Sequence, residues 1–218
     1  MTWKDNNIEV SKLFGANEPD SIFIQNDKFI KNLNIPYNSQ RDNKFAPKSS
    51  CNVTCLQMVL ANHYNVTDDE IYLLCQTDDI HKEIKRRYRN DYDKWIEGYI
   101  KSGKATEVLV VLQEASFHLL KSDRYSKVTF SMNHKLIISE IDKGYPVIIC
   151  GNFTGGHFVV IKGYDLKENA YIVNDPWGNW NTKYKNHDGE NKKYSFSKVW
   201  KIMYKYGILV HADKKIFV

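Results

Sequence analysis

One stretch, residues 48–60, constrains the fold and the chemistry of this chain more than any other. A helix-breaking segment, Pro47 to Ser50, is followed directly by Cys51 and by apolar residues at helical spacing. Serine is a preferred residue just before a helix, so we expect the helix to begin at Cys51. The first backbone N–H groups of a helix are unpaired, and the helix dipole makes that end positive. A thiol placed there is biased toward the thiolate, which predicts a reactive cysteine.

The composition limits the class of protein and its partners. A length of 218 residues suits one domain, or one domain with an insertion, that can bury a core without disulfides. The net charge of +5 would suit an anionic partner such as a cell wall, and without a nucleic-acid-binding motif we expect no nucleic-acid partner. No run reaches the roughly twenty apolar residues of a membrane span, so we expect no stable membrane insertion. The N-terminus lacks the apolar core of a signal peptide, which predicts synthesis in the cytoplasm.

The four cysteines do not have the pattern of a metal site. Cys55 follows Cys51 by one helical turn, a spacing that seldom meets the geometry of a disulfide. No second pair completes a four-ligand zinc set, so we expect no metal ion. Cys55, Cys75 and Cys150 lie in apolar runs and are expected to be buried. A calcium loop at Asn186 to Glu190 would need more ligands than that segment has, so we interpret it as a solvated turn.

The first half of the chain is predicted to be mainly helical. After a short helix at residues 11–14 and a strand at 29–37, the Cys51 helix should run to about His63. Thr67 with Glu70 three residues later has the pattern of a capping box, so a second helix should begin there. The highly charged residues 81–104 are interpreted as a solvated amphipathic helix, with a lid or a wall-binding patch as the alternative. The remaining expected elements are helices at 105–120 and 133–143 and a short strand at 128–130.

The second half changes to β-rich runs separated by turn residues, which is typical of successive antiparallel strands. The expected strands are residues 146–150, 157–164, 170–175 and 207–212, with a helix at 197–205 before the last of them. Helices first and a meander of strands afterwards predict an α+β fold, with an N-terminal helical lobe packed on an antiparallel sheet. We expect one domain over residues 1–218, with an N-terminal extension at 1–30 and a helical insertion at 78–130.

Two residues of the strand region are candidates to activate Cys51. A thiolate nucleophile needs a general base, and histidine suits this role because its ordinary pKa lies near neutral pH. His157 begins an apolar strand directly after Gly155-Gly156, where the backbone can approach a substrate closely. Asp175 ends the next strand, so pairing of the two strands as a hairpin would bring it beside His157. The alternatives are an ordinary strand histidine and an ordinary Asp-Pro turn, but the combination with a helix-start cysteine favours a catalytic set.

Four short segments occur along residues 33–178 in a recognisable order. They are Ile35–Gln40, Ser50–Val59, Gly156–Tyr164 and Asn174–Gly178. This ordered set resembles the C39-like peptidases, a branch of the papain-like cysteine peptidases, although that family usually has glycine where this chain has Asn52. The resemblance implies a papain-like fold, with Cys51 as nucleophile, His157 as general base and Asp175 as the residue that orients it. It also implies that the side-chain amide of Gln40 donates to the oxyanion, beside the backbone N–H of Cys51.

The resemblance also bears on the reaction and its substrate. It implies hydrolysis of amide bonds through an acyl-enzyme, without a cofactor. Some similar proteins cut double-glycine leader peptides as part of a membrane transporter, and others cut the peptides of peptidoglycan. A basic, aromatic-rich chain without a signal peptide looks like a phage endolysin of the second kind, made in the host cytoplasm and released to the cell wall by a holin. The alternatives are a protein or leader-peptide protease, a transglutaminase-like acyl transferase and a catalytically dead binding module.

Three residues beside the predicted catalytic set are candidates to bind the substrate. Gly156 precedes His157, and Trp177 and Trp180 follow Asp175 closely. The two tryptophans, with Tyr184 shortly after them, could form the floor of a substrate groove, or they could cover the edge of the sheet, and both interpretations stay open here.

Overall fold

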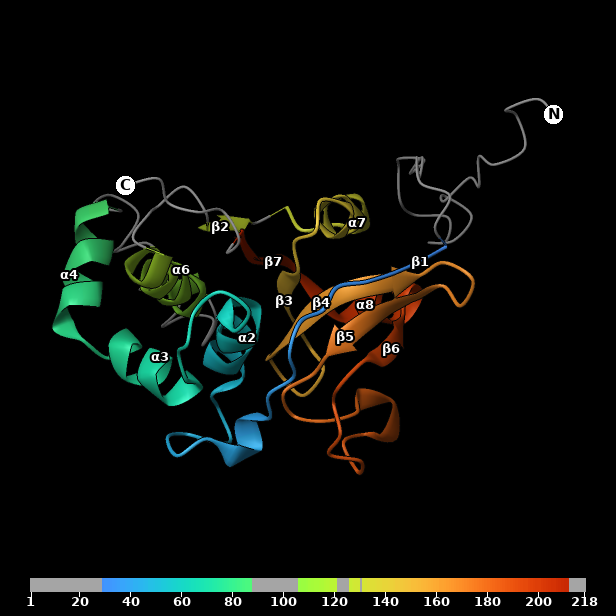
Figure 1. Cartoon of the computed structure of the whole chain (residues 1–218), viewed down its shortest axis with the longest axis horizontal. Helices are drawn as coiled ribbons and strands as arrows, with labels where there is room; N and C mark the ends of the chain where they lie inside the picture. The colour runs from blue at the N-terminus through green and yellow to red at the C-terminus, as the bar shows by residue number, and fades with distance from the viewer. Residues whose placement is uncertain (1–28, 88–105, 121–125, 130, 212–218) are drawn as a thin grey trace.

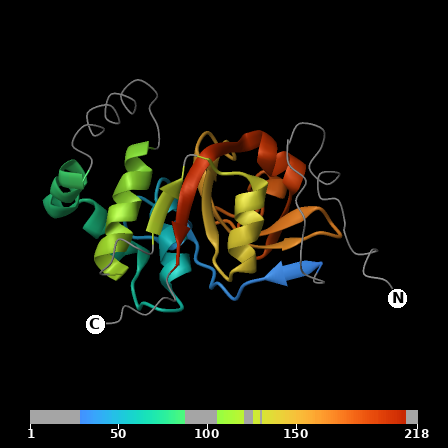
Figure 2. The ribbon, with the colours of Figure 1, turned by 90° about the horizontal axis from the view of Figure 1, so that it is seen from above.

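The computed structural model describes residues 29–87, 106–120, 126–129 and 131–211. Within them, a helical lobe lies at one end of the molecule, and strands β4 (His157–Asp165), β5 (Ala170–Asn174) and β6 (Lys192–Ser195) lie at the other, as Figures 1 and 2 show from two directions. The lobe consists of α2 (Cys51–Leu60), α3 (Asp68–Cys75), α4 (Asp78–Arg87) and α6 (Thr106–Leu120). The predicted α+β class with an N-terminal helical lobe is confirmed. The predicted helix at 11–14 and most of the charged segment 81–104 lie outside the described residues.

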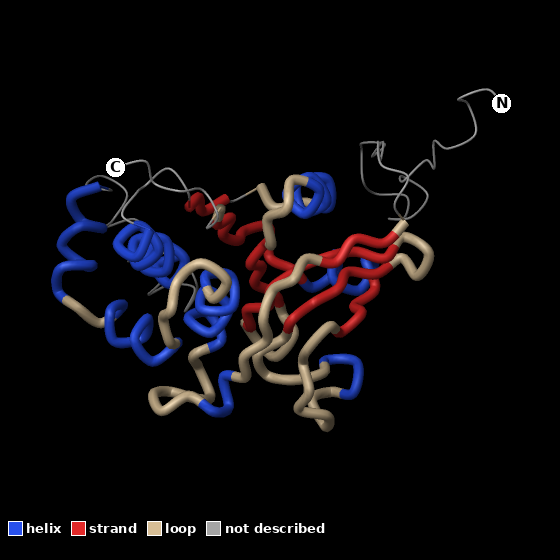
Figure 3. The backbone as a smooth tube through the Cα atoms, viewed as in Figure 1, coloured by secondary structure: helices blue, strands red, loops and turns tan. Residues whose placement is uncertain are grey.

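The strands form one antiparallel sheet, drawn in red in Figure 3. Four consecutive strands make a meander, β7 pairs with the first of them, and β2 pairs with β7, which gives the order β2-β7-β3-β4-β5-β6. The short strand β1 pairs with the far end of β4. The bounds are β1 (Ile30–Asn32), β2 (Ser126–Thr129), β3 (Val147–Gly151), β4 (His157–Asp165), β5 (Ala170–Asn174), β6 (Lys192–Ser195) and β7 (Met203–Val210).

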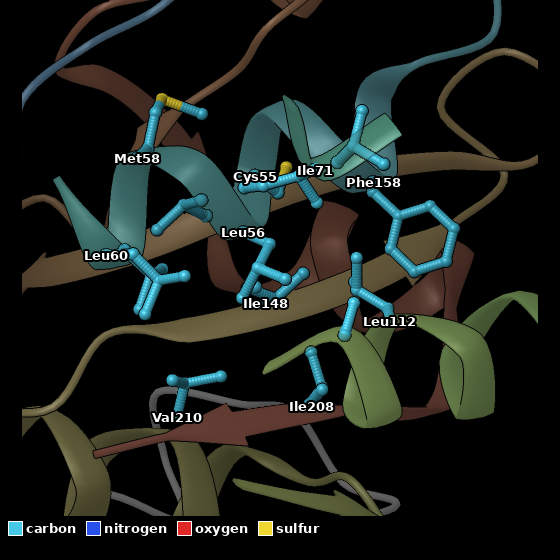
Figure 4. Close-up of a cluster of buried hydrophobic side chains, with 14 of the residues drawn as sticks. Cys55, Leu56, Met58, Leu60, Ile71, Leu112, Ile148, Phe158, Ile208 and Val210 are labelled. Atoms are coloured by element: carbon cyan, nitrogen blue, oxygen red, sulfur yellow. The ribbon is translucent and has the colours of Figure 1, made fainter. Parts of the chain in front are cut away.

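The central strands bury side chains on both faces, which explains their nearly continuous apolar sequences. Alternate residues of β4 point to opposite faces. Phe158 and Val160 face the helical lobe, in a cluster that includes Leu56 of α2 (Figure 4). Val159 and Ile161 face a second cluster, which contains side chains of α7 (His134–Asp142) and α8 (Phe196–Ile202). The sheet therefore separates two cores, and the helix that carries Cys51 covers one of them.

Several predicted boundaries are corrected by the structure. The early strand is confined to Ile30–Asn32, and α2 ends at Leu60, three residues before the expected end. α8 ends at Ile202 because Met203 is already extended, so β7 begins four residues earlier than predicted. The edge strand β6 was not predicted, because its residues are polar apart from one buried tyrosine. None of the described helices has both the length and the apolarity to cross a bilayer.

Candidate active site

Cys51 is the first residue of α2, and its side chain is 9% exposed. Ser50 occupies the N-cap position as predicted, but its side chain does not cap the helix. Its hydroxyl instead accepts a hydrogen bond from Asn43 Nδ2 at 2.8 Å, and the same nitrogen donates to Thr54 Oγ1 at 2.8 Å. The loop before α2 is thereby fastened to the first turn of the helix. Because Ser50 leaves the first-turn N–H groups uncapped, the helix start keeps its positive character beside the thiol.

His157 and Asp175 meet through the pairing of β4 with β5. Val160 pairs with Asn174, so Asp175 lies opposite Val159 and diagonally across from His157 on the same face of the sheet. His157 Nε2 lies 2.7 Å from Asp175 Oδ1, and the two side chains are 4% and 0% exposed. The hairpin geometry expected from the sequence is therefore present. Since Nε2 is bound to the carboxylate, the other ring nitrogen is the one available to the thiol.

The environment of His157 favours its protonated form. Burial by itself would lower the pKa of the imidazole. Hydrogen bonds to Asp175 and Cys51, together with the negative charges of both groups, outweigh burial and raise the pKa of His157 to about 10. An imidazole in this state is suited to pair with a thiolate and to deliver a proton to a leaving group.

A cavity of about 340 Å³ brings together side chains from three distant parts of the sequence. Gln40, Cys51 and His157 all line it. Two of the expected substrate-binding residues, Gly156 and Trp177, line it as well, and the rest of the lining is Lys48, Ser49 and Thr154. The cavity can therefore hold a small segment of substrate directly against the thiol, the imidazole and the amide.

Trp180 does not line this cavity. Its ring is half-buried and packs edge-to-face against Phe153, with ring centroids 5.2 Å apart, and against Tyr194 at 5.4 Å. Of the two interpretations drawn from the sequence, this placement favours the one in which Trp180 covers the sheet.

Gln40 is held at the cavity by a hydrogen bond from its side-chain amide. Its Nε2 donates to the carbonyl oxygen of Pro47 at 2.9 Å, and the side chain is 2% exposed. An amide nitrogen has two hydrogens, so one remains to donate to a substrate oxygen. The neighbouring Arg41 donates from Nε to the Trp177 carbonyl at 2.9 Å, and its guanidinium lies 3.6 Å from the centre of the Trp177 ring. This contact joins the Gln40 loop to the aromatic wall of the cavity.

The segment from Asn186 to Glu190 supports the backbone of Asp175. The Asp175 N–H donates to the Gly189 carbonyl at 2.9 Å. A Cβ at position 189 would lie 1.8 Å from the backbone carbonyl oxygen of Asp175. Close backbone approach therefore explains the glycine. Asp188 forms an ion pair with Lys192 at 2.6 Å. Among the residues that the structure describes, no three His, Cys, Asp or Glu side chains are grouped so that they could hold a metal ion.

Two tyrosines also reach the site: Tyr184, which the sequence offered as a groove or sheet-edge residue, and Tyr194, which it did not single out. Tyr194 and Tyr184 donate to Asp175 Oδ2 at 2.8 and 3.3 Å. Tyr194 is the one buried residue of β6, and Tyr184 has a left-handed backbone conformation with φ 61°. A lone aromatic residue in an otherwise polar strand was the available signal for Tyr194, and it does not by itself point to a carboxylate.

A cysteine at a helix start, facing a histidine at the start of a strand of an antiparallel sheet, defines the class of papain-like cysteine peptidases. The model of a family described as "Peptidase_C39 like family" matches residues 32–208. The chain belongs to this family of C39-like peptidases and is a cysteine peptidase. The resemblance noted in the sequence is thus confirmed.

The comparison with solved structures supports the same fold. The chain is similar to a Bacillus anthracis protein whose crystal structure is described as that of a C39-like peptidase, with a TM-score of 0.55 and 15% sequence identity. The match covers 85% of this chain and 99% of that one. At this identity the likeness bears on the fold alone. No curated protein matches the sequence.

Proposed function

We propose that the chain is a cysteine endopeptidase that cleaves amide bonds with a Cys51–His157–Asp175 triad. One observation carries this proposal. Cys51 and His157 line a single cavity, and His157 Nε2 lies 2.7 Å from Oδ1 of the buried Asp175 carboxylate. Gln40 lines the same cavity, and one hydrogen of its side-chain amide is available to donate to a substrate oxygen. Nucleophile, base, orienting group and oxyanion donor are thereby within reach of one substrate carbonyl.

The roles follow from the arrangement. Cys51 Sγ attacks the carbonyl carbon as a thiolate, while the imidazolium of His157 holds the proton. The developing oxyanion is stabilised by Gln40 Nε2 and the Cys51 backbone N–H. Collapse of the tetrahedral intermediate expels the amine, which takes the proton from His157, and leaves a thioester. His157, now neutral, takes a proton from water, which attacks the thioester and releases the acid and the thiol group.

We propose peptidoglycan peptides as the substrate, in the manner of an endolysin acting at the bacterial cell wall. The side chains that line the cavity include Lys48 and no carboxylate. The whole chain carries a net charge of +5. Both features favour substrates that carry free carboxylates, as wall peptides do. Trp177, stiffened by the stacked Arg41, provides an apolar surface beside the nucleophile.

The test is digestion of purified cell walls, with mass spectrometry of the fragments that are released. New amino termini in the peptide portion are expected for the wild type and should be lost in Cys51→Ala. Cys75→Ala is the matched control, because that cysteine is 5% exposed and lies in α3, away from the cavity. Inert walls together with cleavage of a protein or leader peptide would replace the proposed substrate, and acyl transfer to an added amine would indicate a transglutaminase-like reaction. Undiminished lysis by Cys51→Ala would exclude the thiol mechanism.

A further inference from the structure

The two oxygens of Asp175 have separate sets of partners. Oδ1 lies 2.7 Å from His157 Nε2 and accepts a hydrogen bond from the Trp177 N–H at 3.0 Å. Oδ2 accepts from the Tyr194 hydroxyl at 2.8 Å and from the Tyr184 hydroxyl at 3.3 Å. The carboxylate is 0% exposed, so these contacts replace the water that would otherwise solvate it. The tyrosines therefore fix the Oδ2 side of the carboxylate, and the Trp177 N–H helps to hold the Oδ1 side toward His157.

The direction of the Tyr194 hydroxyl is set by the backbone. The Trp180 N–H donates to the Tyr194 oxygen at 2.9 Å, which leaves the hydroxyl hydrogen to be donated elsewhere. The Gly178 carbonyl lies at 3.3 Å and Asp175 Oδ2 at 2.8 Å, so the carboxylate is the better acceptor. An N–H donated into a hydroxyl polarises its O–H and strengthens the next bond in the series.

Both hydroxyls stay protonated over the pH range in which a peptidase works. Burial, and then the negative charge of Asp175, raise the pKa of Tyr194 and of Tyr184 well above that of an exposed tyrosine. The ring of Tyr184 also packs edge-on against the His157 imidazole, with centroids 6.0 Å apart and an interplanar angle of 87°. Tyr184 thus contacts the carboxylate with its hydroxyl and the base with its ring.

We infer that Tyr194, assisted by Tyr184, is a positioning residue of the catalytic set: it holds the Asp175 carboxylate with Oδ1 on His157 and so keeps the imidazole directed at Cys51. The inference rests on the proposed Cys51–His157–Asp175 triad. Tyr194 lies on β6 and Tyr184 in the loop before it, so both lie C-terminal to all three triad residues. The strand β6 and the loop before it thus complete the catalytic set that earlier elements carry.

The test measures the reactivity of Cys51 without any peptide substrate. Iodoacetamide alkylation is followed by peptide mass spectrometry at pH 6 and pH 10 in the wild type, Tyr194→Phe, Tyr184→Phe and the double variant. At pH 6 the thiolate depends on its imidazolium partner, so Tyr194→Phe should react about tenfold more slowly than the wild type. At pH 10, where even an ordinary thiol is largely ionised, the two rates should agree. Tyr184→Phe should show a smaller loss at pH 6, because its bond is longer.

Tyr164→Phe is the matched control. That tyrosine is 0% exposed, and its hydroxyl donates to the carboxylate of Asp142 at 2.7 Å, away from the cavity. It should lose stability without losing Cys51 reactivity at pH 6. A folded Tyr194→Phe that reacts like the wild type at both pH values would overturn the inference and leave the triad intact. If wild-type Cys51 itself reacts at pH 6 no faster than a free cysteine, the ion pair is absent and the proposed catalysis is overturned together with the role of Tyr194.

Discussion

The backbone N–H of Gln40 donates to the carbonyl oxygen of Pro176 at 3.0 Å. This bond joins the loop that precedes Cys51 to the turn that directly follows Asp175. Gln40 lines the cavity and Asp175 is buried behind His157, so the hydrogen bond fixes the proposed oxyanion donor relative to the His157–Asp175 pair. A catalytic arrangement assembled from distant segments needs such ties, because errors of about 1 Å in placement are costly to the rate.

Loss of the Arg41 side chain should weaken substrate binding. Arg41 donates to the Trp177 carbonyl and stacks on its ring, so Arg41→Ala frees one wall of the cavity to move. We expect kcat/KM for the cleaved peptide to fall roughly tenfold, mainly through a higher KM. Lys44→Ala, which changes an exposed cation of the same loop, is the control. Equal kinetics in the two variants would contradict this role for Arg41.

A side chain at position 189 should not be tolerated. The Cβ of Gly189→Ala would lie 1.8 Å from the Asp175 carbonyl oxygen, which is backbone and cannot move aside without displacing the carboxylate. We expect a loss of roughly 3 kcal/mol or more in the free energy of unfolding, with loss of peptidase activity. The measurement is urea unfolding followed by circular dichroism.

The control for position 189 is Gly144→Ala. Gly144 has φ +95° and no atom within 4 Å of a built Cβ, so alanine there meets backbone strain and no clash. It should cost about 1 kcal/mol. A Gly189→Ala variant that is no less stable than Gly144→Ala would show that the loop can withdraw from Asp175.

The raised pKa of His157 predicts how stability depends on pH. The folded-state pKa of about 10 is above the ordinary value of 6.5, so the folded protein binds the proton more tightly than the unfolded chain does. The resulting stabilisation is fully present below about pH 6.5 and is lost as the pH rises through about 10. We expect the wild type to lose roughly 2–4 kcal/mol more than His157→Gln between pH 6 and pH 10.5 in urea unfolding. Parallel curves for the two proteins would contradict the assignment.

Removal of the Asn43 side chain should loosen the start of α2. Its Nδ2 bridges Ser50 and Thr54 at 2.8 Å each, and the residue is 8% exposed. Asn43→Ala leaves both hydroxyls short of a donor, and we expect a loss of about 2–3 kcal/mol in the free energy of unfolding. Asn65→Ala, at an exposed position, should change stability by less than about 0.5 kcal/mol. Similar unfolding midpoints for the two variants would exclude this bridge as a stabilising contact.

Much of the fold was readable from local sequence signals. The start of α2 at Cys51 and the capping box of Thr67 and Glu70 are present as predicted, because helix starts depend on neighbouring residues. The contact of His157 with Asp175 followed from one hairpin, whose pairing constrains two strands that are consecutive in sequence. The roles of these residues in catalysis remain predictions.

The sequence by itself therefore determined the fold class, the start of a helix at Cys51 and the pair of strands that places His157 beside Asp175. Only the tertiary structure decided that Tyr194 and Tyr184 hold Asp175, that Gly189 packs on its backbone and that Trp180 lies outside the cavity. The physical reason is how far apart in the sequence the contacting residues lie. Helix starts and hairpins are encoded in the spacing of nearby residues, whereas these contacts depend on the register of β6 beside β5 and on the path of the loop between them, which no local spacing specifies.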